Sequence, residues 1–174
     1  MWEKPIKNCP GIPFGFHPGA FGFKRKYEHH TGVDLYTSSG ETVYAMEDGV
    51  IVCITKFTGK NDNSPWWRDT DCVLIKGNSG VICYGEIISN LKVGDFIKTG
   101  DQIAKVETVL HEGKERPDIP GHSRSMLHIE LYPSDKMEPS TPWYLNDEKP
   151  SYLLDPTEYL LSTGFEKLPE WRKA

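Results

Sequence analysis

A strict alternation of apolar and other side chains runs through Met126-Leu127-His128-Ile129-Glu130-Leu131. Successive side chains of a β-strand point to opposite faces of the sheet, so a period of two predicts a strand. Leu127, Ile129 and Leu131 then face the core, and the other three residues face the opposite side. His128 on that second face is either simply exposed to solvent or available as a ligand.

Similar short runs of β-branched and apolar residues lie between turns through most of the chain. They cover residues 42–46, 50–55, 72–76, 81–88, 95–97 and 102–106. Their spacing, with almost no 3.6-residue periodicity, predicts an all-β fold built on one antiparallel sheet core. Asn78-Ser79-Gly80 predicts a hairpin loop, and a short C-terminal helix is predicted over 156–162 with Asp155 as its N-cap.

Length and charge restrict the class of protein. The chain has 174 residues, of which 37% are hydrophobic and 26% charged, which is typical of one soluble globular domain. We expect an N-terminal extension over 1–12, a core domain over 13–162, a C-terminal tail over 163–174, and a monomer. A net charge of -5 without a basic block argues against nucleic acid as a partner.

No stretch of the sequence predicts a membrane segment. The longest apolar stretch, about 49–54, is far shorter than the roughly 20 residues of a membrane helix. The first residues, Met1-Trp2-Glu3-Lys4-Pro5, lack an apolar signal segment, so we expect synthesis in the cytoplasm.

The four cysteines predict neither a disulfide framework nor a four-thiolate zinc site, because no two form a C-x-x-C pair. Cys53, Cys72 and Cys83 lie inside apolar runs and are expected to pack as small hydrophobic residues. Three long loops, 11–29, 58–70 and 110–124, either line a binding groove or are simply mobile.

The stretch His30-Thr31-Gly32-Val33-Asp34 carries a possible metal site. In a straight strand the first and last of these side chains would stand roughly 13 Å apart, so their convergence requires a bend, for which Gly32 provides the freedom. Two histidines and a carboxylate with an open fourth position suit a catalytic zinc ion, and His128 is the candidate for the second histidine. The alternative is a hydrogen-bonded His–Asp pair on the surface.

Several motifs, taken in order, resemble those of the lysostaphin/LytM-type zinc endopeptidases. They are Phe14-Gly15-Phe16-His17-Pro18, His30-Thr31-Gly32-Val33-Asp34-Leu35, Thr42-Val43-Tyr44-Ala45, Asp48-Gly49-Val50-Ile51, Leu91-Lys92-Val93-Gly94-Asp95, Lys98-Thr99-Gly100-Asp101-Gln102-Ile103-Ala104, Leu127-His128-Ile129-Glu130-Leu131 and Asp155-Pro156-Thr157-Glu158-Tyr159-Leu160. The resemblance covers roughly residues 13–161. It implies a β-sheet core of the duplicated-hybrid-motif type and a Zn²⁺ ion held by His30, Asp34 and His128. It also implies hydrolysis of peptidoglycan stem or cross-bridge peptides, and a phage lysin would fit.

Two positions depart from the pattern that this family shows. The family's strand carries His-x-His, whose first imidazole lies beside the metal-bound water, but this chain has Met126 there, which cannot take up a proton. A second family histidine is replaced by Glu86. Period-two alternation places Ile82, Tyr84 and Glu86 on one face, from which Glu86 could reach the groove as the general base.

The other interpretation makes Glu86 an ordinary solvent-facing residue. The protein would then be a catalytically silent relative that binds wall peptide or a protein partner. His122, in the loop before the His128 strand, is a second candidate for the missing base. Tyr84 is a candidate for an oxyanion contact, and Arg124 for a contact with a substrate carboxylate or an oxyanion. Val93-Gly94-Asp95 with residues 100–104 also resembles half of a biotinyl or lipoyl carrier domain, but the chain lacks a suitably placed attachment lysine.

Overall fold

The computed structural model describes residues 1–171, and these residues are almost entirely in strands and loops. The strands are β1 (Glu28–His29), β2 (Val33–Thr37), β3 (Thr42–Tyr44), β4 (Gly49–Thr58), β5 (Thr70–Gly77), β6 (Gly80–Ile88), β7 (Phe96–Ile97), β8 (Gln102–Val106), β9 (Ser125–Tyr132) and β10 (Trp143–Tyr144). One 3₁₀ turn, η1 (Lys60–Asp62), and one α-helix, α1 (Thr157–Leu161), complete the regular structure of the described residues.

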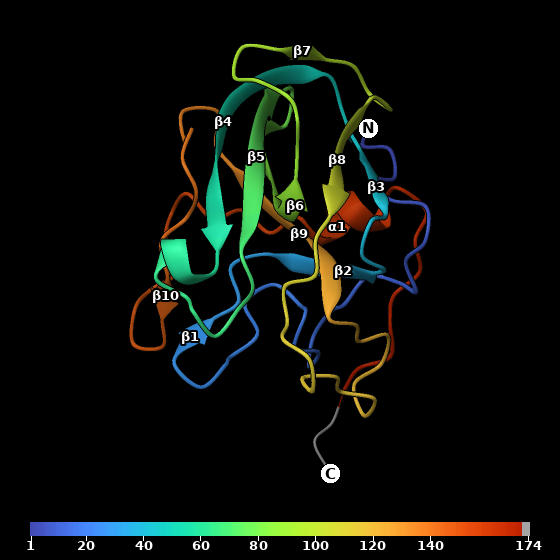
Figure 1. The fold of residues 1–174 in the computed structure, drawn as a ribbon, viewed down its shortest axis with the longest axis vertical. Coiled ribbons are helices and arrows are strands. Elements are labelled where there is room, and N and C mark those ends of the chain that lie inside the picture. The colour runs from blue at the N-terminus through green and yellow to red at the C-terminus, as the bar shows by residue number, and fades with distance from the viewer. Residues whose placement is uncertain (172–174) are drawn as a thin grey trace.

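Eight of these strands form one antiparallel sheet, and β1 pairs separately with β10 (Figure 1). The main order is β2-β9-β6-β5-β4-β7, with β8 joined to the end of β6 and β3 joined to β8. The all-β, antiparallel prediction is confirmed, and each run predicted from the sequence overlaps a strand. The pattern did not predict β2, which lies beside β9 and brings Asp34 opposite His128.

Turn and cap residues act largely as the sequence predicts. Gly77 pairs with Gly80 across a two-residue hairpin loop, and Gly80 has a φ of 127°, which favours glycine. The prediction of Asp155 as the N-cap is wrong by one residue, because Pro156 is the N-cap of α1, which covers Thr157–Leu161 rather than 156–162. The Asp155 carboxylate still accepts a hydrogen bond from the Thr157 backbone N–H at 2.9 Å, which satisfies a free donor at the start of α1.

Strand β9 is buried along all eight of its residues. Leu127, Ile129 and Leu131 belong to the main hydrophobic core, as the alternation predicts. The opposite face is covered as well, because Tyr132 packs in a second apolar cluster and Met126 in a third. His128 therefore lies in the interior, where a polar side chain needs partners.

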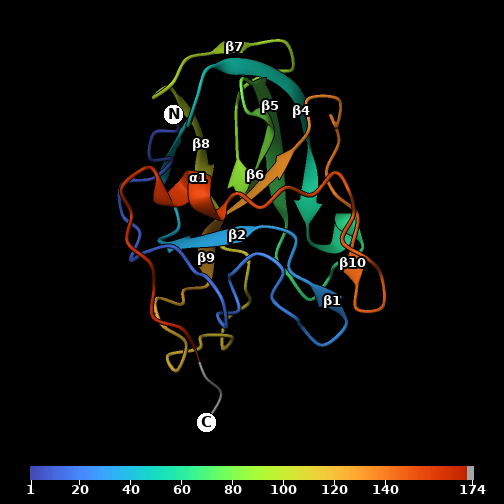
Figure 2. The same ribbon diagram turned by 180° about the vertical axis from the view of Figure 1, so that it is seen from behind.

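Segments outside the sheet also contribute to the core. Trp2, Ile6 and Ile12 pack in the main cluster, and so does Leu160 of α1. Figure 2 shows α1 beside the sheet, near β2 and β8. Ile12 forms a parallel bridge with Lys167 near the end of the described chain. The domain limits predicted at residues 12 and 162 stay predictions, and residues 172–174 of the predicted tail lie outside the described residues.

The cysteines behave as small hydrophobic residues. All four are free, and Cys72 and Cys83 are fully buried together in the second apolar cluster. No helix within residues 1–171 combines the length and the apolar character needed to cross a membrane.

Candidate metal centre

Three side chains from two neighbouring segments meet in the interior. Asp34 on β2 pairs directly with His128 on β9, and His30 lies in the turn just before β2. All three are buried, with 3–4% of their surface exposed. The surface-pair alternative is therefore wrong: these residues lie inside the protein.

Gly32 allows this approach in a way that the sequence did not predict. Its φ lies outside the left-handed region, so backbone freedom is not the reason for a glycine. A Cβ atom built there would lie 2.4 Å from the Ile129 carbonyl oxygen and 2.7 Å from His128 Nε2. Gly32 is thus required because β9 passes too close for any side chain.

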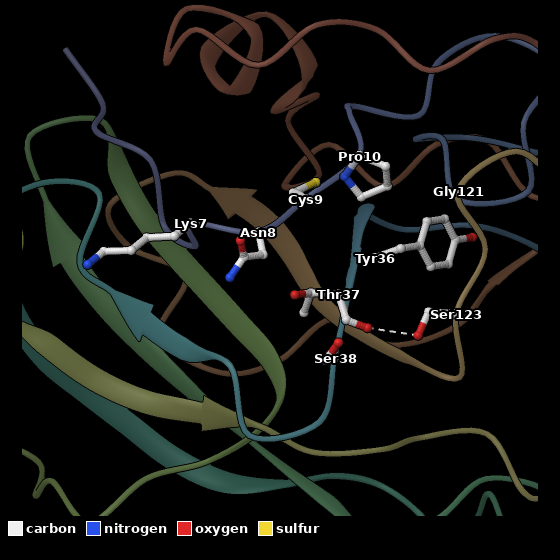
Figure 3. Close-up of a pocket in the computed structure, with 9 residues that line it drawn as sticks. All are labelled: Lys7, Asn8, Cys9, Pro10, Tyr36, Thr37, Ser38, Gly121 and Ser123. Atoms are coloured by element: carbon white, nitrogen blue, oxygen red, sulfur yellow. Dashed lines mark hydrogen bonds between the residues drawn. The ribbon is translucent and has the colours of Figure 1, made fainter.

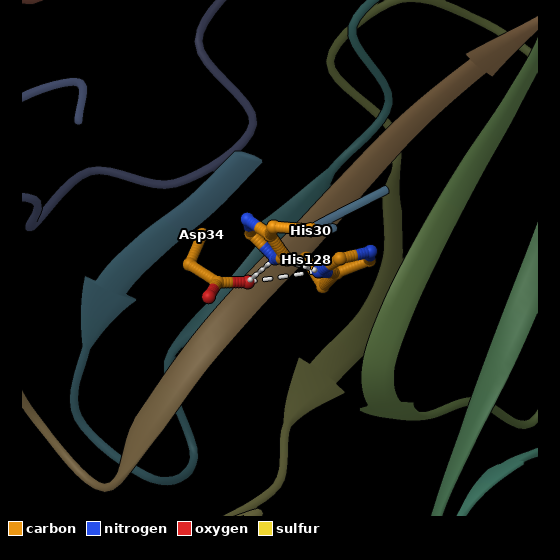
Figure 4. A group of neighbouring side chains, drawn as sticks. All are labelled: His30, Asp34 and His128. Atoms are coloured by element: carbon orange, nitrogen blue, oxygen red, sulfur yellow. Dashed lines mark hydrogen bonds and ion pairs between the residues drawn. The ribbon is translucent and has the colours of Figure 1, made fainter. Parts of the chain in front are cut away.

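The three potential ligand atoms lie close to the spacing that a zinc ion requires (Figure 4). His30 Nε2 is 3.3 Å from both Asp34 Oδ1 and His128 Nδ1, and the latter two atoms are 2.8 Å apart. Tetrahedral zinc with bonds of about 2.0–2.1 Å places its ligands about 3.3–3.4 Å from one another. The described part of the chain contains one such group of His, Cys, Asp or Glu side chains, and it is this one.

Hydrogen bonds on the outer side of each ring fix its tautomer. His30 Nδ1 lies 2.9 Å from the Ala20 carbonyl oxygen, which can only accept, so Nδ1 carries the proton and Nε2 a lone pair. His128 Nε2 lies 2.8 Å from Glu130 Oε1, so Nδ1 of that ring carries the lone pair. With neutral rings, the lone pairs of His30 Nε2 and His128 Nδ1 and the Asp34 carboxylate oxygen face one point. This arrangement favours the binding of a cation.

In the absence of a cation, hydrogen bonds and charge attraction among these residues determine their ionisation. Burial opposes charge on both groups, but hydrogen bonds with Asp34 and Glu130 raise the pKa of His128 well above its ordinary value. Attraction to His30 and hydrogen bonds with both rings hold the pKa of Asp34 well below its usual range, again against burial. In the metal-free protein, a proton on His128 therefore takes the place of a metal ion. The two imidazoles and the Asp34 carboxylate are ligands of a kind that fits Zn²⁺.

Comparison with known proteins assigns the chain to a family. Residues 28–139, more than half of the chain, match the model of peptidase family M23. The chain belongs to peptidase family M23. This membership supports a peptidase function and confirms the resemblance to lysostaphin/LytM-type proteins. No curated protein matches the sequence.

Solved structures of the M23 fold are similar at low sequence identity. A zinc-containing peptidase from Vibrio cholerae has a TM-score of 0.51 and 20% identity over 85% of this chain. A putative M23 peptidase from Pseudomonas aeruginosa has a TM-score of 0.50 and 14% identity over 92% of this chain. The catalytic domain of lysostaphin from Staphylococcus simulans has a TM-score of 0.49 and 20% identity over 84% of this chain and 90% of its own. The chain spans 40% of the Vibrio chain and 50% of the Pseudomonas chain.

A buried carboxylate, Glu130, contacts the candidate metal centre through His128. Glu130, 1% exposed, receives hydrogen bonds from the Thr31 hydroxyl at 2.5 Å and from the Tyr132 hydroxyl, besides its contact with His128. Burial opposes its ionisation, but these three hydrogen bonds lower the pKa of Glu130. The sequence analysis placed Glu130 on the same face as His128 but gave it no role. Two residues that are two positions apart on one strand are neighbours on one face, and this spacing could have indicated the contact.

Glu86 faces the candidate ligands because of a β-bulge and not because of the alternation that the sequence predicted. Ile82 and Tyr84 face the main core, so the shared face predicted for these two and Glu86 is wrong. Glu86 has a φ of 62°, and Ile87 returns to the core after it. On β5, Cys72 pairs with Gly85 and Asp71 with Ile87, which leaves Glu86 as the extra residue of a β-bulge.

The bulge places the Glu86 carboxylate in a buried position within electrostatic reach of the metal centre. Its Oε2 has no hydrogen-bond partner in the described chain. Burial, and then repulsion from Asp34, raise the pKa of Glu86 to about 8, whereas His128 and Arg25 act in the opposite direction. The alternative of a solvent-facing Glu86 is wrong, because only 9% of the residue is exposed.

His122 is not one of the three residues whose ligand atoms lie within 4.8 Å of one another, although its ring interacts electrostatically with Asp34. Its ring is half-buried and packs 5.2 Å from the Tyr36 ring, and its Nδ1 accepts a hydrogen bond from the Arg116 backbone N–H. Burial lowers the pKa of His122, with weaker attraction to Asp34 opposing the shift. Met126 lies opposite Tyr36 in the β2–β9 register and packs in an apolar cluster with it, where it offers no proton acceptor.

Two other candidates are occupied elsewhere. The Tyr84 hydroxyl accepts a hydrogen bond from the Met46 backbone N–H in the core. Arg124 Nε pairs with Glu115 Oε1 at 2.8 Å, whereas Arg124 Nη1 is buried without a hydrogen-bond partner among the described residues. The sequence missed Arg25, whose Nη2 lies 3.5 Å from Asp34 Oδ2, because nothing in its local pattern indicates where its loop folds.

A pocket of about 440 Å³ lies apart from the candidate metal centre (Figure 3). It is lined by residues 7–10 of the N-terminal segment, by residues 36–38 at the end of β2, and by Gly121 and Ser123. The Ser123 hydroxyl closes one side by donating to the Thr37 carbonyl oxygen at 2.7 Å. None of the three candidate ligands lines this pocket.

Proposed function

We propose that this M23 protein is a zinc-dependent metallo-endopeptidase that cleaves peptides of bacterial peptidoglycan or related short peptides. The observation that carries the proposal is the convergence of three potential ligand atoms, His30 Nε2, Asp34 Oδ1 and His128 Nδ1, at close to tetrahedral spacing. The peptidoglycan substrate rests on the motif resemblance to lysostaphin/LytM-type endopeptidases.

The residues of the chain would hold the ion and manage the protons. A zinc ion bound there would lower the pKa of a coordinated water and polarise a peptide carbonyl. His30, Asp34 and His128 would hold it, and Glu130 would keep the Nδ1 lone pair of His128 aimed at the site.

Glu86 is the group best placed to act as general base. Its Oε2 is free of hydrogen bonds within residues 1–171 and can accept a proton from an attacking water. The same atom can then return that proton to the leaving nitrogen. A cation at the neighbouring ligands would lower the pKa of Glu86 and favour the carboxylate form that a base requires.

Met126 favours a second candidate function. It replaces the imidazole that the family places beside the metal water. The second candidate is therefore a silent relative that binds wall peptide or a protein partner without cleaving it. The two functions differ in turnover and agree on metal binding.

The experiment is a metal analysis combined with a digestion assay. Protein purified without chelator is analysed for zinc and incubated with peptidoglycan and its soluble stem peptides, and products are identified by mass spectrometry. The control for Glu86→Gln is Glu112→Gln, which changes an exposed glutamate in the 110–124 loop.

One zinc per chain with turnover that is lost in Glu86→Gln and kept in Glu112→Gln supports the endopeptidase. Bound zinc without turnover on any wall substrate supports the silent binding protein. Failure to bind zinc at all contradicts both descriptions of the metal centre.

A further inference from the structure

A cationic side chain stands at the outer edge of the candidate metal centre. Arg25 Nη2 lies 3.5 Å from Asp34 Oδ2 and 3.2 Å from the Pro18 carbonyl oxygen. The other carboxylate oxygen, Asp34 Oδ1, is the one that faces His30 and His128. Arg25 therefore approaches Asp34 from the side that points away from the meeting point of the ligands.

Most of the hydrogen-bonding capacity of Arg25 is unused. A guanidinium carries five N–H donors, yet both contacts of this side chain within residues 1–171 are made by Nη2. The contact with Asp34 is also long, because charge-assisted N–H···O bonds usually measure about 2.7–2.9 Å. The side chain of Arg25 is 31% exposed, against 5% for that of Asp34, so Arg25 is accessible from solvent where Asp34 is not.

When a cation occupies the candidate metal centre, Asp34 no longer balances the positive charge of Arg25. A divalent cation at Oδ1 takes up the negative charge of Asp34, which is the ion-pair partner of Arg25. Glu86 also attracts Arg25, but its carboxylate is buried and would face the same cation. Two other arginines on loops are already paired, Arg116 with Asp118 and Arg124 with Glu115. Arg25 is thus an accessible cation beside Asp34, and it forms no short ion pair within residues 1–171.

We propose that Arg25 binds a carboxylate of the substrate next to the peptide bond that is cleaved. The inference rests on the proposed function and deepens it, because it names the substrate class as peptides with an acidic group at that position. Arginine suits the role, since its guanidinium stays charged and donates charge-assisted hydrogen bonds to carboxylates.

The test compares two forms of one probe. The probe is a synthetic wall stem peptide with free carboxylates, and the matched form has every carboxylate amidated. Binding of both is measured by titration calorimetry to the zinc-loaded Glu86→Gln protein, so that the readout does not depend on turnover. The same pair is then used with the unsubstituted protein to compare kcat/KM.

We expect the acidic peptide to bind at least about tenfold more tightly than its amide, in line with a charge-assisted contact. Arg25→Gln, added to the Glu86→Gln protein, should reduce this preference to less than twofold by weakening only the acidic peptide, and Arg25→Lys should keep part of it. Lys26→Gln, which removes an exposed cation from the same loop, should leave the preference unchanged.

Three results would overturn the inference. The first is equal binding of the two peptides by the unsubstituted site. The second is an equal loss for both peptides in Arg25→Gln, which would indicate an oxyanion contact or a structural role. The third is loss of zinc together with the preference in both Arg25→Gln and Arg25→Lys. Charge preference without any turnover in the unsubstituted protein would refute the proposed hydrolysis alone.

Discussion

Gly32→Ala should disable the metal centre without removing any ligand. The new Cβ would lie 2.4 Å from the Ile129 carbonyl oxygen, 2.7 Å from His128 Nε2 and 2.9 Å from Glu130 Cγ. Real Cβ contacts do not fall below 3.0 Å, so β2 and β9 must separate locally by about 0.6 Å. The residue lies between two ligands, His30 and Asp34, and against the third.

The cost has two parts that can be measured separately. Overpacking of this kind destabilises a fold by about 1–3 kcal/mol. Displacing the ring of His128 from its Glu130 contact should weaken zinc binding by about 10–100-fold, the range found when outer partners of metal ligands are lost. Zinc affinity is measured by competition with a chromophoric chelator, and stability by urea unfolding of the metal-free protein.

Gly113→Ala provides the matched control. Gly113 has a φ of 82° and no atom within 4 Å of an added Cβ, so its substitution costs only backbone strain of about 1–2 kcal/mol. Zinc affinity should not change. A Gly32→Ala protein that binds zinc as tightly as the unsubstituted chain would refute the close approach of β9 as the reason for this glycine.

Three further outcomes follow from the site. Glu130→Gln should weaken zinc binding about 10–100-fold in the chelator competition, because His128 loses its charged partner; unchanged affinity would contradict this support. Burial raises the pKa of Glu86 to about 8, so the folded metal-free protein holds a proton that the unfolded chain releases above about pH 4.5. As the pH rises from about 4.5 to about 8, its free energy of unfolding should fall by up to a few kcal/mol. In Glu86→Gln this dependence of the unfolding free energy on pH should become weaker. If urea unfolding gives the same pH dependence for both proteins, the buried Glu86 is not its cause. Tyr84→Phe should cost about 1–3 kcal/mol by leaving the buried Met46 N–H unpaired, with zinc affinity unchanged.

The sequence predicted the sheet because Leu127, Ile129 and Leu131 alternate along β9 and face the main core, and it predicted the candidate ligands because their motifs resemble those of a known family. It could not predict the close packing at Gly32, since this depends on β2 lying against β9, and residues 33–37 show no alternation: all five are buried. It also misplaced Glu86, because an alternation rule assumes an uninterrupted strand and the extra residue of a bulge reverses the faces. Arg25 was missed because its position depends on how the loop of residues 11–29 folds.

The conformation of Glu86 favours a functional role over a structural one. A non-glycine residue in the left-handed region costs about 1–2 kcal/mol, and a buried carboxylate oxygen without a hydrogen bond costs more. Neither cost is needed for the sheet, since a regular β6 would put residue 86 on the core face with Ile82 and Tyr84. The bulge instead turns an acidic group toward Asp34 and His128 and then returns Ile87 to the core. Strain and an unsatisfied acceptor at one residue, both directed at the same metal centre, are what a proton acceptor for bound water requires.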